Sequence, residues 1–138
     1  MLKIGVTGTR NGMTVVQREQ VREFLRTKLE EFKAGELHHG DCVGVDEQVA
    51  ILASELGYKT VNHPPVEDSL RAFHKSDFVL EPLTYFARNR NIVNNTDILI
   101  VVPREDSHQS KGGTWYTHDY AIKVGKSVKI FYPNKMVF

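Results

Sequence analysis

Three short loops of the sequence carry glycine where a backbone could approach a phosphate group. They are residues 8–12, 40–44 and 112–113, and each is expected to join the end of a strand to the start of a helix. Glycine accepts positive φ and has no side chain that would keep a phosphate oxygen away. The N-terminus of the helix that follows adds about half a positive charge. The pattern predicts a binding site for a phosphorylated ligand.

None of the three loops contains the Gly-Lys-Ser/Thr of a Walker A loop or spells Gly-x-Gly-x-x-Gly. Each loop alone is also explained by ordinary turn geometry. In an open parallel sheet, however, such loops meet at the carboxyl ends of the strands, which is where ligands bind. The set of loops therefore favours a site, and its candidate residues are Gly8, Thr9, Gly40, Gly112, Gly113, Thr114 and Thr117.

Three arginines could add charged hydrogen bonds to such a ligand: Arg10, Arg88 and Arg90. A guanidinium group presents a planar set of donors that suits phosphate or carboxylate. The alternative for each of them is a solvated side chain on the surface. We expect all three to belong to the ligand site.

Three aspartates are candidates for contacts to a sugar or for general-base chemistry: Asp41, Asp46 and Asp119. Each lies near the predicted start of a helix, where a carboxylate could equally cap the helix or complement its dipole. His118 stands beside Asp119, and we interpret it as a surface residue rather than as half of an acid–base pair.

A metal site is suggested at first sight by His38, His39, Asp41 and Cys42. Adjacent residues on a strand point to opposite faces, so His38 and His39 cannot readily bind one ion. No second cluster has the spacing of a zinc site. We expect neither a metal ion nor another cofactor.

The elements that must position these residues alternate between strand and helix, which is typical of a parallel sheet with crossover helices. The 138 residues fit one domain, 1–138. We predict a Rossmann-like three-layer α/β domain with a mostly parallel sheet of about five strands. The predicted strands are 2–6, 37–39, 58–62, 98–102 and 127–132, and the helices begin near residues 15, 46, 88 and 114.

Local sequence signals refine this outline. Thr14 and Gln17 have the spacing of a capping box at the start of a helix that stops near Gly35. Gly57 is placed to end the second helix in the left-handed conformation. The apolar run 98–102 predicts the central strand. Between residues 63 and 82 the pattern breaks down, as expected of a functional or mobile connection.

Composition limits the function classes. The formal net charge is +1, so a basic excess for nucleic acid is absent and we expect nucleic-acid binding to be unlikely. Cys42 is the single cysteine, which favours a reducing compartment. The first residues run directly into a strand pattern, and no apolar run reaches membrane-spanning length. We expect a cytoplasmic protein that does not contact membranes.

Four segments, in order, resemble one superfamily: IGVTGTR at 4–10, HGDCVGVD at 39–46, RNRNIVNNTD at 88–97 and GGTWYT at 112–117. The ordered set resembles the SLOG superfamily of Rossmann-like proteins, which joins the DNA-processing protein DprA with the LOG phosphoribohydrolases and nucleotide-sensing domains. The resemblance covers nearly the whole chain. It implies a nucleotide-type pocket formed by these loops, often in a homodimer or higher oligomer.

The LOG enzymes share Pro-Gly-Gly-x-Gly-Thr-x-x-Glu and a preceding arginine. The resemblance places that arginine on Arg88 and the glutamate on Asp119. Lys111 stands at the proline, Trp115 and Tyr116 replace the Gly-Thr, and the carboxylate is one methylene shorter. These departures favour binding over catalysis.

Three function classes follow. The leading hypothesis is a domain that senses or sequesters a nucleotide or a nucleotide-derived phosphorylated small molecule. The enzymatic alternative is a LOG-like N-glycoside hydrolase acting on nucleoside monophosphates, in which Asp119 would be the catalytic carboxylate and Arg88 would position the phosphate. The third is DprA-like binding of single-stranded DNA, which calls for stacking aromatics and a basic track.

Overall fold

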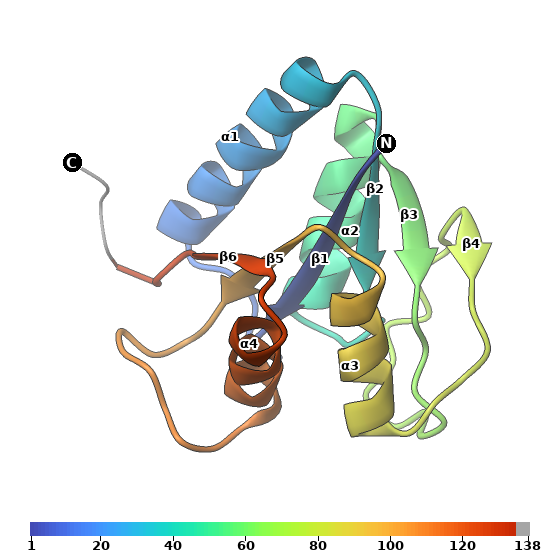
Figure 1. Ribbon diagram of the computed structural model, residues 1–138, viewed down its shortest axis with the longest axis vertical. Helices are drawn as coiled ribbons and strands as arrows, with labels where there is room; N and C mark the ends of the chain where they lie inside the picture. Colours follow the sequence, from blue (N-terminus) through green and yellow to red (C-terminus); the bar gives the residue numbers. More distant parts are fainter. Residues whose placement is uncertain (135–138) are drawn as a thin grey trace.

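A six-stranded sheet forms the centre of the computed structural model, which describes residues 1–134 (Figure 1). Its order is β4-β3-β2-β1-β5-β6, and every pairing between neighbouring strands is parallel. The strands are β1 (Leu2–Gly8), β2 (Gly35–His39), β3 (Lys59–Asn62), β4 (Phe78–Val79), β5 (Ile98–Val102) and β6 (Ser127–Ile130). The helices are α1 (Val15–Phe32), α2 (Val45–Leu56), α3 (Tyr85–Asn94) and α4 (Gly113–Lys123).

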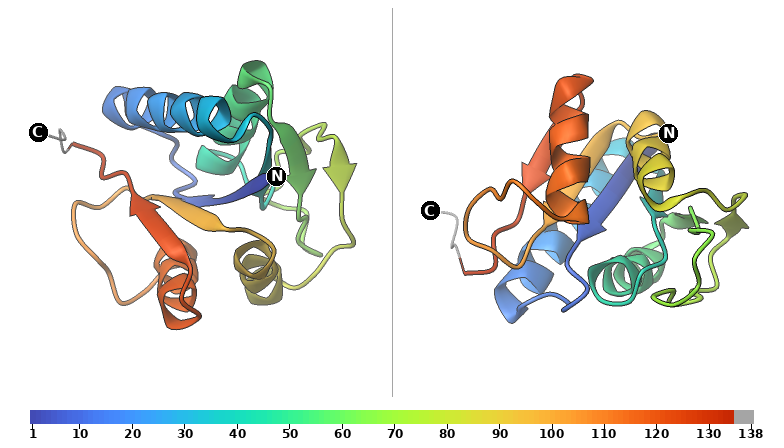
Figure 2. Two further views of the ribbon diagram at one scale, coloured as in Figure 1. Left: turned by 45° about the horizontal axis from the view of Figure 1, so that its top comes forward. Right: turned by 90° about the horizontal axis from the view of Figure 1, so that it is seen from below.

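The helices cover both faces of the sheet, α1 and α2 on one face and α3 and α4 on the other (Figure 2). This is the arrangement of a Rossmann-like α/β fold with three layers, as the alternating sequence pattern predicted. Within residues 1–134, no helix combines the length and the apolar composition that crossing a bilayer requires.

The strand count and the strand order correct two expectations. The sheet has six strands rather than about five, because Phe78 and Val79 pair with Val61 and Asn62. Two exposed residues leave no periodic pattern in a sequence, so this short edge strand was missed. The run 98–102 is also not the central strand, since β5 is the second strand from one edge of the sheet, between β1 and the edge strand β6. It is apolar because helices cover both of its faces.

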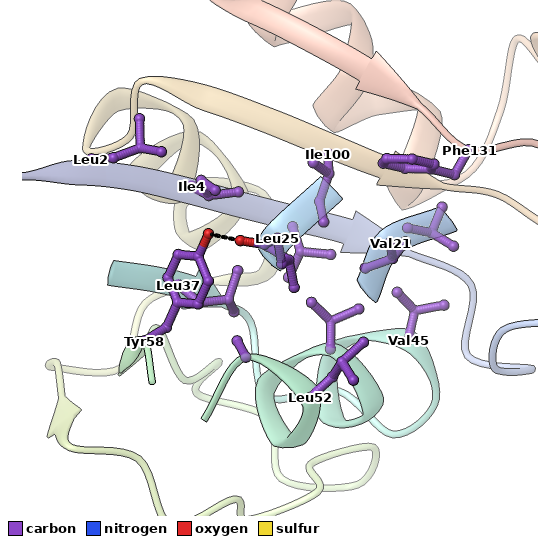
Figure 3. Close-up of a cluster of buried hydrophobic side chains, with 14 residues drawn as sticks. Leu2, Ile4, Val21, Leu25, Leu37, Val45, Leu52, Tyr58, Ile100 and Phe131 are labelled. Carbon is purple, nitrogen blue, oxygen red and sulfur yellow. Dashed lines mark hydrogen bonds between the residues drawn. The ribbon is translucent and has the colours of Figure 1, made fainter. Parts of the chain in front are cut away.

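The larger core lies between the sheet and the helices α1 and α2 (Figure 3). Val21 and Leu25 of α1 and Leu52 of α2 are fully buried there against Ile4 of β1. Each such side chain contributes about 1.5–3 kcal/mol when it leaves water. The Tyr58 hydroxyl donates to the Leu25 carbonyl over 2.6 Å, as drawn in Figure 3, so this core contains a satisfied polar group.

The predicted helix ends are largely confirmed. Thr14 and Gln17 form the capping box of α1, with both reciprocal hydrogen bonds present. Gly57 ends α2 at φ 110° in the left-handed conformation. Helix α1 ends at Phe32, and Lys33 rather than a glycine takes the left-handed position at φ 70°. Helix α3 begins at Tyr85, three residues earlier than predicted.

Strand β1 is the point at which the strand order reverses. From β1 the chain continues through β2, β3 and β4 toward one edge, and it then returns to place β5 on the other side of β1. The loop after β1 leads to α1 on one face, whereas the loop after β5 leads to α4 on the opposite face. Loops that part in this way leave a crevice at the carboxyl ends of the two strands, which is the usual ligand position in such sheets.

Candidate functional site

A cavity of about 670 Å³ lies at this crevice. Its walls come from the end of β1 with its loop, from the start of α2, from α3, and from the loop after β5 with the first turns of α4. A volume of this size is in the range of small-molecule sites. The cavity is therefore the candidate functional site.

Most of the residues singled out in the sequence line this cavity. These are Gly8, Thr9, Arg10, Asp46, Arg88, Gly112, Gly113, Thr114 and Thr117. Four others do not: Gly40, Asp41, Arg90 and Asp119. The loops 8–12 and 112–113 thus meet at one place, whereas the loop 40–44 reaches the cavity through Cys42.

Arg88 on α3 is the most constrained charged residue of the cavity. It is 2% exposed. Its Nε donates to the side chain of Asn89 over 2.7 Å, and its Nη1 donates to the carbonyls of Gly40 and, at 3.2 Å, His63. Its Nη2 meets only the Cys42 sulfur, at 3.7 Å, among residues 1–134. Three contacts therefore fix the guanidinium while Nη2 keeps donor capacity toward the cavity.

The buried charge of Arg88 has no carboxylate in direct contact. Among residues 1–134, none of the ion pairs within 4.0 Å involves Arg88. Asp46 lies near enough for the two charges to influence each other, but its carboxylate accepts from the Cys42 N–H at 3.3 Å instead. A buried cation is costly unless an anion compensates it. The arrangement favours a ligand that supplies negative charge.

Three titratable groups in the cavity, Cys42, Asp46 and Tyr85, have pKa values that burial raises. Burial raises the pKa of Asp46 to about 6, even though the neighbouring Arg88 favours the ionised form. Burial also raises the pKa of the Cys42 thiol to about 11. Cys42 is therefore protonated near neutral pH and is not poised as a nucleophile. Asp46 can exchange a proton in the range of general acid–base groups.

The N-terminus of α4 forms the opposite wall. Gly112, its N-cap, has φ 101° and space where a side chain would stand, and no side chain caps the first turn. Gly113 packs against the hydroxyl of Tyr85, where a side chain at Gly113 would overlap it. Thr117 directs its hydroxyl to the Gly113 carbonyl over 2.8 Å. The backbone N–H groups of this first turn are left for a ligand.

The loop after β1 closes the floor of the cavity. The Thr9 N–H donates to the Val102 carbonyl, and the Thr9 carbonyl accepts from the Val45 N–H, both over 3.1 Å. Gly8 packs against Val45 so closely that any side chain at Gly8 would overlap it. Helix α1, which follows, already has its own cap at Thr14, so its N-terminus is less available than that of α4.

Two predicted residues of loop 40–44 support the site from outside the cavity. Gly40 packs against the Arg88 guanidinium, and its carbonyl oxygen accepts a hydrogen bond from Arg88 Nη1. Asp41 is fully buried and accepts from Arg71 and from the His74 N–H, each over 2.9 Å. Asp41 therefore holds the segment 71–74 in place. From the sequence, Asp41 was instead a candidate for a contact to a sugar.

Arg90 and Asp119 point to other partners. Arg90 donates to the Tyr116 hydroxyl over 2.8 Å and so joins α3 to α4. Asp119 lies on α4 and accepts from His108 and His118. Neither residue belongs to the cavity lining, so the position that the LOG resemblance assigned to a catalytic carboxylate lies away from it.

Several cavity residues were not among the predicted site residues. Tyr85 lines it from α3, and Arg104, Glu105 and Lys111 line it from the loop after β5. Trp115 is 2% exposed and donates from its indole to Glu105 over 3.1 Å. A polar loop gives no pattern that reveals which of its side chains turn inward. For Arg104 and Glu105, the position after an apolar strand was the only available signal, whereas Lys111 and Trp115 stood out as departures from the LOG motif.

The ionisable lining favours anions. Of the cavity residues, four carry positive charge and two carry carboxylates: Arg10, Arg88, Arg104 and Lys111 against Asp46 and Glu105. The chain as a whole has a net charge of only +1. Positive charge is therefore concentrated in the lining of the cavity.

Comparison with known proteins gives matches only at the level of structure. No family model matches the chain. No curated protein matches its sequence. Solved structures do match, at sequence identities near one fifth.

The molybdenum cofactor binding protein of the phototrophic bacterium Rippkaea orientalis matches with a TM-score of 0.71 and 22% identity, over 95% of this chain and 76% of that one. The molybdenum cofactor carrier protein of Chlamydomonas reinhardtii matches with a TM-score of 0.64 and 22% identity, over 94% of this chain and 75% of that one. DNA processing protein A of Streptococcus pneumoniae matches with a TM-score of 0.70 and 19% identity, over 94% of this chain and 50% of that one. These likenesses confirm the Rossmann-like α/β fold that the sequence predicted.

Proposed function

We propose that the chain binds a nucleotide or a nucleotide-derived phosphorylated small molecule in the 670 Å³ cavity. The observation that carries the proposal is Arg88, a buried guanidinium that lines the cavity without a carboxylate within 4.0 Å in residues 1–134. The uncapped first turn of α4 lines the same cavity. Phosphate satisfies both, because it accepts from a guanidinium and from helix N-terminal N–H groups.

The remaining lining suggests how the rest of the ligand is held. Phosphate would lie between Arg88, Arg10 and the N–H groups of Gly113 and Thr114. Asp46 would accept a hydroxyl of the sugar, since a carboxylate is the usual acceptor for ribose in this type of sheet. The fold supports small-molecule binding as well, because two of the similar structures are named for binding or carrying a molybdenum cofactor.

A calorimetric screen tests the proposal. Untagged protein would be titrated with nucleoside monophosphates, diphosphates, cyclic nucleotides and dinucleotides, alongside mass spectrometry of small molecules that copurify. We expect one phosphorylated class to bind at one site per chain. Absence of binding across the panel, with no copurifying phosphorylated molecule, would contradict the proposal. A salt-sensitive affinity for single-stranded DNA would instead favour the DprA-like function.

A second candidate function is hydrolysis of the N-glycosidic bond of a nucleoside monophosphate. One observation favours it: Asp46 lines the cavity with a pKa of about 6, which suits general acid–base chemistry. Release of free base that is lost in Asp46→Asn and retained in Asp119→Asn would support this activity with Asp46 as the carboxylate. Loss in Asp119→Asn alone would restore the assignment implied by the LOG resemblance.

We also propose a homodimer or higher oligomer. Large apolar side chains are exposed in the segment 66–86, among them Val66, Phe73, Phe78, Val79 and Phe86. A segment with this many exposed large apolar side chains favours contact with a second copy of the chain. Light scattering should give at least twice the 15.7 kDa chain mass, and Phe78→Glu should lower it. A monomeric wild-type protein would contradict this proposal.

A further inference from the structure

A second group of chemically active side chains lies outside the cavity. Asp119 Oδ1 accepts from His108 Nε2 and from His118 Nδ1, each over 2.8 Å. The three ligand atoms all lie within 4.8 Å of one another. One face of the group is open, because the His108 and Asp119 side chains are 50% and 54% exposed, while His118 is 14% exposed.

The fold brings this group together from two elements. His118 and Asp119 are consecutive on α4, and His108 comes from the loop that joins β5 to α4. Figure 1 shows that this loop, drawn in orange, runs alongside α4. Trp115, one turn before His118, packs its ring against both imidazoles, with centroids 5.0 Å from His108 and 5.2 Å from His118. A buried indole thus supports both imidazoles of the group.

We infer that His108, His118 and Asp119 form a binding site for a divalent transition metal, with Zn²⁺ as the preferred ion. Two imidazole nitrogens and one carboxylate oxygen are ligands of open zinc sites, which keep a fourth position for water. Zinc bonds of about 2.0–2.2 Å place tetrahedral ligand atoms about 3.3–3.6 Å apart. The two 2.8 Å contacts would widen by about 0.5–0.8 Å, and the two imidazole nitrogens, which lie within 4.8 Å of each other, would adopt the same spacing.

The expectation of no metal was drawn from His38 and His39, and these residues do lie apart. His38 pairs with His63, whereas His39 contacts Ser76. The site proposed here joins a loop residue to a helix residue ten positions later, a spacing that matches no zinc motif in the sequence.

The proposed site stands behind one wall of the cavity. Gln109, Ser110 and Lys111, which directly follow His108, line the cavity. A metal bound to His108 and to α4 would therefore fix this wall relative to the helix. The inference does not depend on the proposed function, because its evidence lies entirely in the His108, His118 and Asp119 side chains.

The sole tryptophan provides a specific optical probe. Trp115 lies about 5 Å from both imidazoles, so Cu²⁺ or Ni²⁺ at the site should quench its fluorescence. Untagged protein, stripped with a chelator, would be titrated with Zn²⁺ by calorimetry and with Ni²⁺ by fluorescence. We expect one ion per chain in both titrations. Addition of Zn²⁺ should prevent the quenching by Ni²⁺.

Three variants make the test decisive. His108→Ala and Asp119→Ala should each weaken Zn²⁺ binding by about 10-fold or more. Asp106→Asn removes another exposed carboxylate from the same loop and should leave the affinity unchanged. Circular dichroism would verify that each variant is folded. Absence of binding to the wild type, or an affinity retained within twofold in folded His108→Ala, would overturn the inference.

Discussion

The guanidinium of Arg88 occupies the space in which a side chain at Gly40 would stand. A Cβ atom on Gly40 would lie 2.7 Å from Arg88 Nη1, and that same nitrogen donates to the Gly40 carbonyl. A glycine at the end of β2 therefore determines where the buried charge of α3 points. This relationship gives Gly40 a role in the site although it does not line the cavity.

Gly40→Ala should displace Arg88 and impair both stability and ligand binding. Overpacking of this kind costs about 1–3 kcal/mol of unfolding free energy, measured by urea denaturation. The affinity for the phosphorylated ligand should also fall by about tenfold, as expected when a charge-assisted hydrogen bond loses its geometry.

Gly35→Ala is the matched control for Gly40→Ala. A Cβ atom on Gly35 would lie 2.6 Å from the Tyr58 ring, and Gly35 stands at the start of β2, at the opposite end of the strand from the cavity. This variant should lose stability without losing affinity per folded molecule. Equal affinity losses in the two variants would show that Gly40 acts only through general stability.

Buried histidines should make the protein sensitive to acid. Burial lowers the pKa of His39 and of His63 to about 3, from an ordinary value of 6.5. Between these values the unfolded chain binds more protons than the folded one, so stability falls as the pH drops from about 6.5 toward 3. Each histidine contributes a slope of up to about 1.4 kcal/mol per pH unit.

Between about pH 4 and 6, Asp46 has the opposite effect on the pH dependence of stability. Its pKa is raised from 3.8 to about 6, so the folded state binds the extra proton there and stability falls as the pH rises from about 4 to 6. Two histidines outweigh one aspartate, and we expect a net loss of stability on acidification from pH 6.5 to 4.5. Urea denaturation across this range tests it, and His63→Asn should reduce the slope. A stability that rises on acidification would contradict the assignment.

Gln17 should contribute more to stability than its part in the capping box. Its side-chain NH₂ donates to the carbonyls of Pro103 and Phe131 over 2.7 and 2.9 Å in a buried position. Gln17→Glu keeps an acceptor for the Thr14 N–H but replaces the donor with a negative oxygen. We expect a loss of about 2–4 kcal/mol in the free energy of unfolding.

Thr14→Ala provides the comparison for Gln17→Glu. Loss of an N-cap costs about 1 kcal/mol. Thermal and urea denaturation of both variants should therefore rank Gln17→Glu as the more destabilised. Equal losses would mean that the bonds to Pro103 and Phe131 add little beyond the cap.

Local sequence signals predicted the elements well where they depend on neighbouring residues. The capping box of Thr14 and Gln17 and the left-handed Gly57 involve contacts within one or two helical turns, and both are present. The short strand β4 was missed because its two residues become a strand only by pairing with β3. The strand order was likewise not readable from the apolar run 98–102, since burial on both faces does not require a central position.

The candidate site was predictable in its loops but not in its side-chain partners. The convergence of loops 8–12 and 112–113 follows from the topology of a parallel sheet. The packing of Arg88 on Gly40 and the pairing of Asp41 with Arg71 depend on tertiary contacts across 48 and 30 positions. The contact between Asp119 and His108 was not predictable either, because the path of a polar loop leaves no periodic pattern in the sequence.

The most direct test of the proposed function is a calorimetric cycle on Arg88. The phosphorylated ligand found by the screen and its dephosphorylated counterpart would be titrated into wild type, Arg88→Gln and Arg26→Gln, each checked for folding. Arg26 is an exposed control on α1 that pairs with Glu23 and Glu30. Removal of the phosphate should weaken binding about tenfold or more in wild type and Arg26→Gln, and by a clearly smaller factor in Arg88→Gln, in which only Arg10 and the N-terminus of α4 still contact the phosphate. An equal effect of phosphate removal in all three proteins would contradict binding of phosphate by Arg88.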